Sequence, residues 1–174
     1  MPSDASAKVP SALLADAPPA LDSRSGFIAA LGWGVHSAIA QRARQIVAVS
    51  PQFADWPLDD DALLQALGGW LRLPQRRLTL LAADYARLPL RCPRFSRWRA
   101  DHAHAVETWV APAELAAALP TLLLGGDSIV QLFDDVHWRG RGNVDPRLAH
   151  ALREEIDVVL QRSERGWPLV TLGL

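Results

Sequence analysis

Two apolar runs joined by a glycine-rich turn, within residues 119–135 (LPTLLLGGDSIVQLFDD), constrain the fold of this chain most strongly. The turn, Gly-Gly-Asp at 125–127, stands between segments rich in leucine, isoleucine and valine, a pattern that is typical of a β-hairpin. We therefore expect strands over 121–124 and 129–133. We interpret the rest of the chain around this hairpin.

The size and composition of the chain indicate one folded domain after a tail. Of its 174 residues 49% are hydrophobic and 21% are charged, which is typical of globular rather than disordered chains. A domain of about 150 residues buries roughly 68–70% of the surface of its unfolded chain, so a sizeable core can form. Residues 1–22 are rich in alanine, proline, serine and aspartate and predict a mobile tail. We expect residues 23–174 to form a single α/β domain.

Charge and cysteine content restrict the partners and the location. A net charge of −1 provides no overall field that would gather nucleic acid or an anionic membrane, so such a partner requires a local patch. The single cysteine, Cys92, excludes an intramolecular disulfide and a cysteine-based zinc cage, and it fits a reducing compartment. No signal segment opens the chain, and no apolar run approaches the ~20 residues that span a bilayer. We expect a cytoplasmic bacterial protein without membrane association.

Apolar periodicity predicts that helices and strands alternate before the hairpin. The expected helices are one that begins at Ser23 or Ser25 and ends at Arg42 or Arg44, one between Asp59 and Pro74, one after Pro93 and a short one over 112–119; the expected strands are 45–50, 77–83 and 105–110. This alternation predicts right-handed crossovers and a three-layer α/β sandwich with a mixed, mostly parallel central sheet.

The chain after the hairpin is expected to add one helix and little else. Residues 136–146 (VHWRGRGNVDP) predict a polar loop. Asp145 followed by Pro146 predicts the start of a final helix. The apolar end WPLVTLGL predicts an edge strand over 169–172 or a segment that docks in an interface.

This order of elements, over residues 26–163, resembles one half of the phospholipase D superfamily fold; a flavodoxin-like doubly wound domain is the alternative. In the phospholipase D family, His-x-Lys followed four residues later by Asp opens a hairpin of this kind. The resemblance implies that the histidine attacks phosphorus and the lysine holds the phosphate oxygens. Aligning the turn aspartate on Asp127 puts Pro120 in place of the histidine and Leu122 in place of the lysine. Neither residue can perform these roles, so we expect no catalytic residue at this site.

The hypothesis that follows is a non-catalytic phospholipase D-like module that acts in binding or self-association, with a phosphate-containing ligand and without metal or cofactor. One alternative is a phosphodiesterase or nuclease with non-standard residues, for which His102, His104, Asp127 and His137 must converge. His137 and Arg139 repeat the His-x-basic spacing, but the acid that follows stands one residue late. Another alternative is a protein that binds nucleic acid without catalysis.

An arginine-rich segment and two strand ends supply the candidate binding residues. Arg94, Arg97 and Arg99 belong to the densest charge cluster; on a helix Arg87, Arg91 and Arg94 would share one face, while Arg97 and Arg99 would point elsewhere. One side of the cluster could thus hold a phosphate or a nucleic-acid backbone, with Trp98 for stacking. The alternative is a solvated face neutralised by nearby acids.

Ser50 and Asp84 follow predicted parallel strands, where ligands bind in open sheets, although both residues also suit caps of the following turns. Asp127 and His137 complete the set of candidate ligand-binding residues.

Several further residues have a structural and a functional interpretation. His102 and His104 would need ligands from another element to hold a metal, and surface histidines near a helix end are the simpler interpretation. Trp138 and Trp167 lie in stretches without amphipathic cover, beside arginines. Exposed tryptophan of this kind is enriched at protein interfaces. We therefore expect a homodimer or a protein partner, and the resemblance agrees, because single halves of that fold pair.

Overall fold

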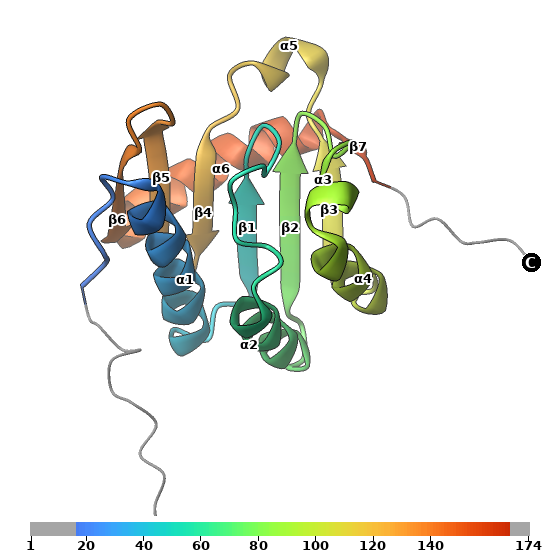
Figure 1. Ribbon diagram of the computed structural model, residues 1–174, viewed down its shortest axis with the longest axis horizontal. Helices are drawn as coiled ribbons and strands as arrows, with labels where there is room; N and C mark the ends of the chain where they lie inside the picture. The colour runs from blue at the N-terminus through green and yellow to red at the C-terminus, as the bar shows by residue number, and fades with distance from the viewer. Residues whose placement is uncertain (1–16, 168–174) are drawn as a thin grey trace, which may run out of the picture.

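The computed structural model describes residues 17–167, which form three layers around one central sheet (Figure 1). The strands are β1 (Gln45–Val49), β2 (Arg77–Ala82), β3 (Val106–Val110), β4 (Thr121–Gly125), β5 (Ser128–Asp134), β6 (Arg139–Val144) and β7 (Glu164–Arg165). The helices are α1 (Arg24–Ala40), α2 (Asp61–Leu71), α3 (Leu88–Arg91), α4 (Pro93–Asp101), α5 (Ala113–Ala116) and α6 (Pro146–Gln161). Figure 1 shows α1, α2 and α4 on one face of the sheet and α6 on the other.

The strand order is β6-β5-β4-β1-β2-β3-β7. This confirms the predicted α/β sandwich with a mixed sheet, but the sheet contains fewer parallel pairs than expected. Only β1 with β2 and β2 with β3 run parallel, whereas the other four pairs are antiparallel. A parallel crossover needs a dozen or more residues, and the connection over 111–120 between β3 and β4 is shorter. β4 therefore begins at the end of the sheet where β3 stops and runs back beside β1.

Glycines let α1 approach the hairpin closely. A Cβ at Gly34 would lie 2.9 Å from side-chain atoms of Leu123 and Val130, and a Cβ at Gly125 would lie 2.4 Å from the Cβ of Ala38. The backbones of helix and hairpin thus touch where side chains would keep them apart. This is the physical reason for glycine inside a helix whose propensity it lowers.

The predicted caps are confirmed at both long helices. Ser23 caps α1 and accepts a hydrogen bond from the backbone N–H of Gly26 at 3.1 Å. Asp145 caps α6 and accepts hydrogen bonds from the next two backbone N–H groups of the helix, at 3.0 and 3.1 Å. Between them these helices cover opposite faces of the hairpin, so the sheet has a hydrophobic cluster on each side.

The predicted polar loop after the hairpin is wrong, because residues 139–144 form the edge strand β6. Its sequence, RGRGNV, contains no aromatic residue and only one of the β-branched residues that mark a strand, Val144. The glycines are needed there because a Cβ at Gly140 would lie 2.2 Å from the carbonyl oxygen of Gln131. The close approach of β5 therefore requires glycine in β6. That approach is a tertiary contact, which the local sequence does not reveal.

The boundary of the predicted tail also needs correction. Leu21 is buried, and its carbonyl accepts a hydrogen bond from the N–H of Gly140 at 3.3 Å. Residues 17–22 therefore belong to the folded domain and lie along β6. Residues 1–16 of the predicted tail and the predicted edge strand over 169–172 lie outside the described residues.

Candidate functional site

The predicted site residues lie at two opposite ends of the sheet. Ser50 and Asp84 follow β1 and β2, and His137 lies in the β5–β6 turn at the same end. Asp127 lies in the β4–β5 turn at the other end, because the neighbouring Gly125 pairs with Ile46 at the start of β1. One site cannot contain all of these residues.

A cavity of about 250 Å³ lies at the end of β1, between the loop that follows this strand and the β5–β6 turn. We call it the sheet-end cavity. Its lining residues are Phe27, Ser50, Pro51, Gln52, Ala54, Asp55, Trp56, Thr121, Leu132, Asp135 and Trp138. None of them is an arginine or a lysine.

Aromatic rings form much of the cavity wall. The ring centroid of Phe27 lies 5.7 Å from that of Trp138 and 6.1 Å from that of Trp56, the latter pair at an interplanar angle of 89°. Trp138 at one side and Phe53 beneath Trp56 both have a backbone φ of +55°, which is rare for bulky residues. Such strain persists only where the surroundings impose it, and it concentrates at functional sites.

The polar groups of the cavity include a hydroxyl and two carboxylates. Ser50 is buried, and its Oγ accepts a hydrogen bond from the N–H of Phe53 at 3.0 Å, so it also caps the turn as the structural interpretation expects. Asp55 lies 3.6 Å from Arg24. Asp135 is exposed and forms no ion pair with any residue of the described range 17–167.

Two other predicted residues lie near this end of the sheet but do not line the cavity. Asp84 is exposed, and its carboxylate accepts a hydrogen bond from the N–H of Ala86 at 2.9 Å, which caps a turn. His137 pairs with Asp134, with 2.7 Å between Nδ1 and Oδ2. Hydrogen bonds from the backbone and side chain of His137 lower the pKa of Asp134. These residues shape the loops around the cavity.

The arginine-rich segment does not form the predicted binding face. The helix is interrupted at Cys92, so α3 and α4 present their arginines separately. Arg94 pairs with Asp61 at 2.8 Å, which supports the alternative of a neutralised surface. Arg97 is exposed.

Arg99 is buried, contrary to its predicted role at a ligand-binding surface. Only 6% of the residue is exposed, and its guanidinium lies 4.0 Å from the ring centroid of Trp167. Burial lowers the pKa of Arg99, because the charged form loses its water. This side chain packs within the protein and is not available to a polymer at the surface.

Residues at the aligned positions of the phosphate-cleaving pair do not reach the cavity. Leu122 is 1% exposed and belongs to the hydrophobic cluster on the α6 side of the sheet. Thr121 lines the cavity instead, since successive residues of a strand point to opposite faces. A His-x-Lys pair at 120 and 122 would therefore put its lysine into the core.

The histidines that the hydrolase alternative requires do not converge with Asp127. His102 stacks on Trp98 at a centroid distance of 4.5 Å at the end of α4, whereas His137 lies in the β5–β6 turn. Within the described residues no group of three or more His, Cys, Asp or Glu side chains is arranged to hold a metal ion.

The two tryptophans that were expected to be exposed are both half-buried. Trp138 and Trp167 pack against the larger hydrophobic cluster. Trp167 also stacks on Tyr85 at a centroid distance of 5.3 Å. They are less exposed than the sequence predicts, and a protein interface at these two residues stays a prediction.

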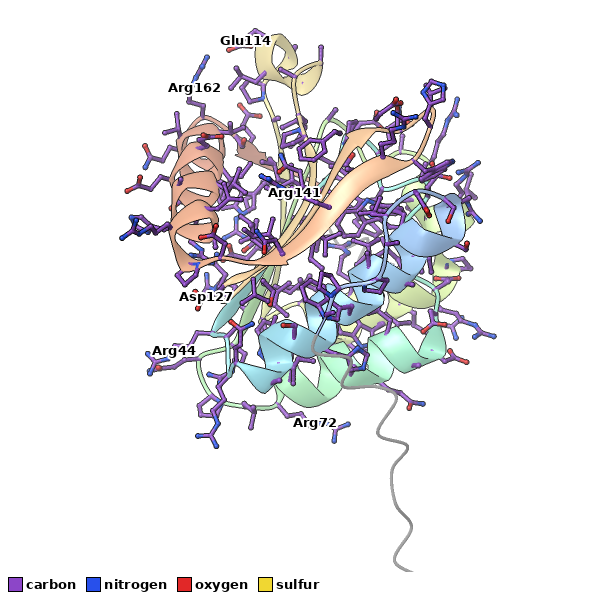
Figure 2. The ribbon with its side chains drawn as sticks, turned by 90° about the vertical axis from the view of Figure 1, so that its left-hand side faces the viewer. Arg44, Arg72, Glu114, Asp127, Arg141 and Arg162 are labelled. Atoms are coloured by element: carbon purple, nitrogen blue, oxygen red, sulfur yellow. The ribbon has the colours of Figure 1, made fainter. Side chains whose placement is uncertain are left out.

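The opposite end of the sheet carries a group of arginines that sequence reasoning missed. They precede β1 (Arg42 and Arg44) and follow α2 (Arg72 and Arg76), and we call these four residues the basic end. Figure 2 shows Arg44 and Arg72 extending outward at the end of the ribbon where Asp127 lies, away from Glu114 and Arg162. Because β1 and β2 are parallel neighbours, the α1–β1 and α2–β2 loops lie side by side although they are distant in the sequence. The useful signal was the position of each arginine pair directly before a parallel strand.

Most of the basic end is free of internal partners. Arg42, Arg44 and Arg72 are exposed and form no ion pair with another described residue. Arg76 is half-buried and donates from Nη1 to the carbonyl of Pro74 at 3.1 Å. Arg77, next in sequence, is neutralised by Glu107.

Comparison with solved structures gives a match to the crystal structure of a phospholipase D family member, Nuc, from Salmonella typhimurium. The match has a TM-score of 0.48 and 11% sequence identity, and it covers 77% of this chain and 89% of that chain. No protein-family model and no curated protein matches the chain. In the part of the chain that the structure describes, no helix is long and apolar enough to cross a membrane.

Proposed function

We propose that this chain is a non-catalytic binding module on a phospholipase D-like scaffold, and that its basic end binds the phosphate backbone of a nucleic acid. The observation that carries the proposal is a set of exposed arginines, Arg42, Arg44 and Arg72, on two adjacent loops, which form no ion pair within residues 17–167. The order of helices and strands supports the scaffold. Pro120 and Leu122 at the aligned positions of the reactive pair support the absence of phosphate cleavage.

The chemistry of arginine suits phosphate. Its guanidinium group stays charged and offers paired N–H donors that match two oxygens of one phosphate. A carboxylate partner inside the protein would compete for those donors. Arg42, Arg44 and Arg72 have no such partner among residues 17–167, so their full charge is available at the surface.

The arrangement of the arginines favours a polymer over one small phosphate. Arg44 and Arg72 extend from the basic end in different directions (Figure 2). One enclosed phosphate needs donors that converge, whereas a nucleic-acid backbone offers a phosphate at regular intervals to donors that are spread over a surface. Such contacts position the polymer without reading its sequence.

Fluorescence anisotropy of a labelled 20-base-pair duplex tests the proposal at several salt concentrations. Three phosphate contacts predict a slope of about −2.7 in log K against log salt, at about −0.9 per contact. The triple variant Arg42→Gln/Arg44→Gln/Arg72→Gln should lose most of this binding. The matched control replaces Arg87, Arg94 and Arg97, three exposed arginines outside the basic end, with glutamine and should bind like the parent chain.

Three results would contradict the proposal. They are binding that does not depend on salt, an equal loss in both triple variants, and binding to anionic lipid vesicles without binding to the duplex.

The absence of catalysis is tested separately with a chromogenic phosphodiester. We expect no turnover above that of a buffer blank. If turnover appears and disappears in His104→Ala or His137→Ala, the chain is a hydrolase with non-standard residues, and the non-catalytic proposal is wrong.

We also propose self-association, now on the basis of two exposed apolar side chains instead of Trp138 and Trp167. Phe133 is 60% exposed and Val136 is 76% exposed, both beside the β5–β6 turn. Exposed apolar side chains that form a contiguous patch are typical of interaction surfaces, and these two residues are the ones at this turn that could form one. We expect a dimer in sedimentation velocity at rising protein concentration and a monomer in the Phe133→Ser variant, whereas a monomer in both chains would remove self-association from the proposal.

A further inference from the structure

The sheet-end cavity lies at the end of the sheet opposite the basic end and has the opposite electrostatic character. Its charged lining residues are Asp55 and Asp135, and no basic residue of the described range lines it. Asp55 shares its charge with Arg24 at 3.6 Å, a loose and exposed pair. Asp135 has no ionic partner in residues 17–167. An anionic ligand would meet repulsion here, whereas a cation would find a carboxylate without a competitor.

The aromatic wall of the cavity also favours a positively charged ligand. Phe27, Trp56 and Trp138 line it: the ring of Phe27 packs against both tryptophans, and Trp138 is the most exposed of the three. The faces of such rings carry partial negative charge and attract ammonium groups, most strongly those of tryptophan. Within residues 17–167 no arginine or lysine side chain lines the cavity, so none of these occupies the aromatic wall. Two independent features, the rings and the free carboxylate, thus select for positive charge.

The shape of the cavity is held by its loops. The N–H of Phe53 donates to Ser50, and the N–H groups of Val136 and His137 both donate to Asp134 at 3.0 Å. The left-handed backbone at Phe53 and Trp138 stands in the same two loops. A site that is formed before the ligand arrives loses less entropy on binding, so even a small ligand can bind measurably. The strain at these positions is consistent with a site that is built for a ligand.

The size of the cavity limits the ligand. About 250 Å³ is below the range of roughly 300–1,000 Å³ that drug-sized ligands occupy. A volume of this size suits an ammonium group with a few carbon atoms. We propose that the sheet-end cavity binds a small alkylammonium or quaternary ammonium group, held by aromatic faces and by the carboxylate of Asp135.

Three probes of nearly the same shape and different charge test this inference. They are tetramethylammonium, tert-butanol and pivalate, titrated at constant ionic strength and followed by tryptophan fluorescence and by the indole N–H signals in NMR spectra. Tetramethylammonium should bind at least tenfold more tightly than tert-butanol, and pivalate should not bind. Equal binding of the three probes, or tighter binding of pivalate, would overturn the inference, as would no binding of tetramethylammonium.

Two exposed aspartates, one inside and one outside the cavity, distinguish specific binding of the cation from a general effect of removing negative charge. Asp135→Asn should weaken tetramethylammonium about tenfold and leave tert-butanol unchanged. Asp84→Asn removes the same charge at the same end of the sheet, but outside the cavity, and should change neither probe. Unchanged binding in Asp135→Asn, or an equal loss in both variants, would show that the cavity does not recognise the cation.

A short peptide that carries trimethyllysine identifies the source of the ammonium group. Tighter binding than tetramethylammonium, lost in Asp135→Asn, supports a modified protein side chain. Exclusion of the peptide while tetramethylammonium binds supports a free small molecule. Both readouts are independent of the duplex assay, because the two surfaces lie at opposite ends of the sheet.

Discussion

Leu122 is the position where a lysine would have to be restored to rebuild the phosphate-cleaving pair, and we predict that the fold does not tolerate it. Its side chain is 1% exposed and packs on the α6 side of the sheet among residues such as Val47, Leu124 and Ile156. Losing the contacts of a buried leucine costs about 2–5 kcal/mol in substitutions to alanine. Burying an unpaired ammonium adds a cost of several kcal/mol.

The variant Leu122→Lys should therefore lose on the order of 5 kcal/mol, which is comparable to the whole stability of many domains. For a domain of this size, Tm falls by roughly 2–4 °C per kcal/mol, so we expect a decrease of about 10–20 °C. Urea unfolding followed by circular dichroism at pH 7 measures the loss. Leu122→Met, which conserves the volume, should cost less than about 1.5 kcal/mol and serves as the control.

The pH dependence distinguishes a buried lysine from one that escapes to solvent. Burial lowers the pKa of a lysine in the folded state, so between the folded and unfolded values the unfolded chain binds more protons. Stability then rises with pH, and the penalty in Leu122→Lys should shrink between pH 7 and pH 10. A variant that unfolds at the parent urea concentration, or whose penalty does not change with pH, would refute the placement of Leu122 in the core.

The remaining predictions concern a cap, a close contact and a buried hydroxyl. Asp145→Ala removes both hydrogen bonds that Asp145 accepts at the start of α6 and should cost about 1 kcal/mol in urea unfolding, whereas Asp145→Asn should cost little. Gly125→Ala puts a methyl group 2.4 Å from the Cβ of Ala38 and should cost about 1–3 kcal/mol, less when Ala38→Gly is present in the same chain. Tyr85→Phe removes a hydroxyl whose single proton is shared between two backbone carbonyl oxygens, at 3.0 and 2.9 Å, and should cost about 1–3 kcal/mol. Because burial raises the pKa of Tyr85, its contribution is complete below about pH 10 and declines above it, so urea midpoints between pH 8 and 11 should fall more steeply in the parent chain than in the variant.

Local chemistry explains which parts of the fold could be predicted from the sequence. Caps such as Ser23 and Asp145, and the Gly-Gly-Asp turn, act within a few residues, so the sequence contains both partners of each interaction. The strand β6 depends instead on the proximity of β5 to Gly140. The burial of Arg99 depends on Trp167, which lies far along the chain. Neither contact leaves a local pattern in the sequence.

The candidate site was predicted in part for the same reason. Ser50 follows a strand whose apolar run is plain in the sequence, and it does line the cavity. The other walls, Trp56, Asp135 and Trp138, come from loops that meet only because β4 returns beside β1. The two arginine pairs of the basic end are likewise separated by β1 and α2. The sequence therefore revealed the arginine-rich segment, whose residues are consecutive along the chain, but not the basic end, whose residues come together only in the fold.

The antiparallel pairing of β1 with β4 has a consequence for the order in which the protein can assemble during synthesis. β1 leaves the ribosome well before β4, because α2, β2, α3, α4, β3 and α5 are translated between them. Until β4 emerges, one backbone edge of the central strand has no permanent neighbour, and its apolar residues face the nascent chain and the chaperones that attend it. The β4–β5 hairpin then covers this edge of β1, so a chain truncated after β3 would keep an open edge that can pair with other chains.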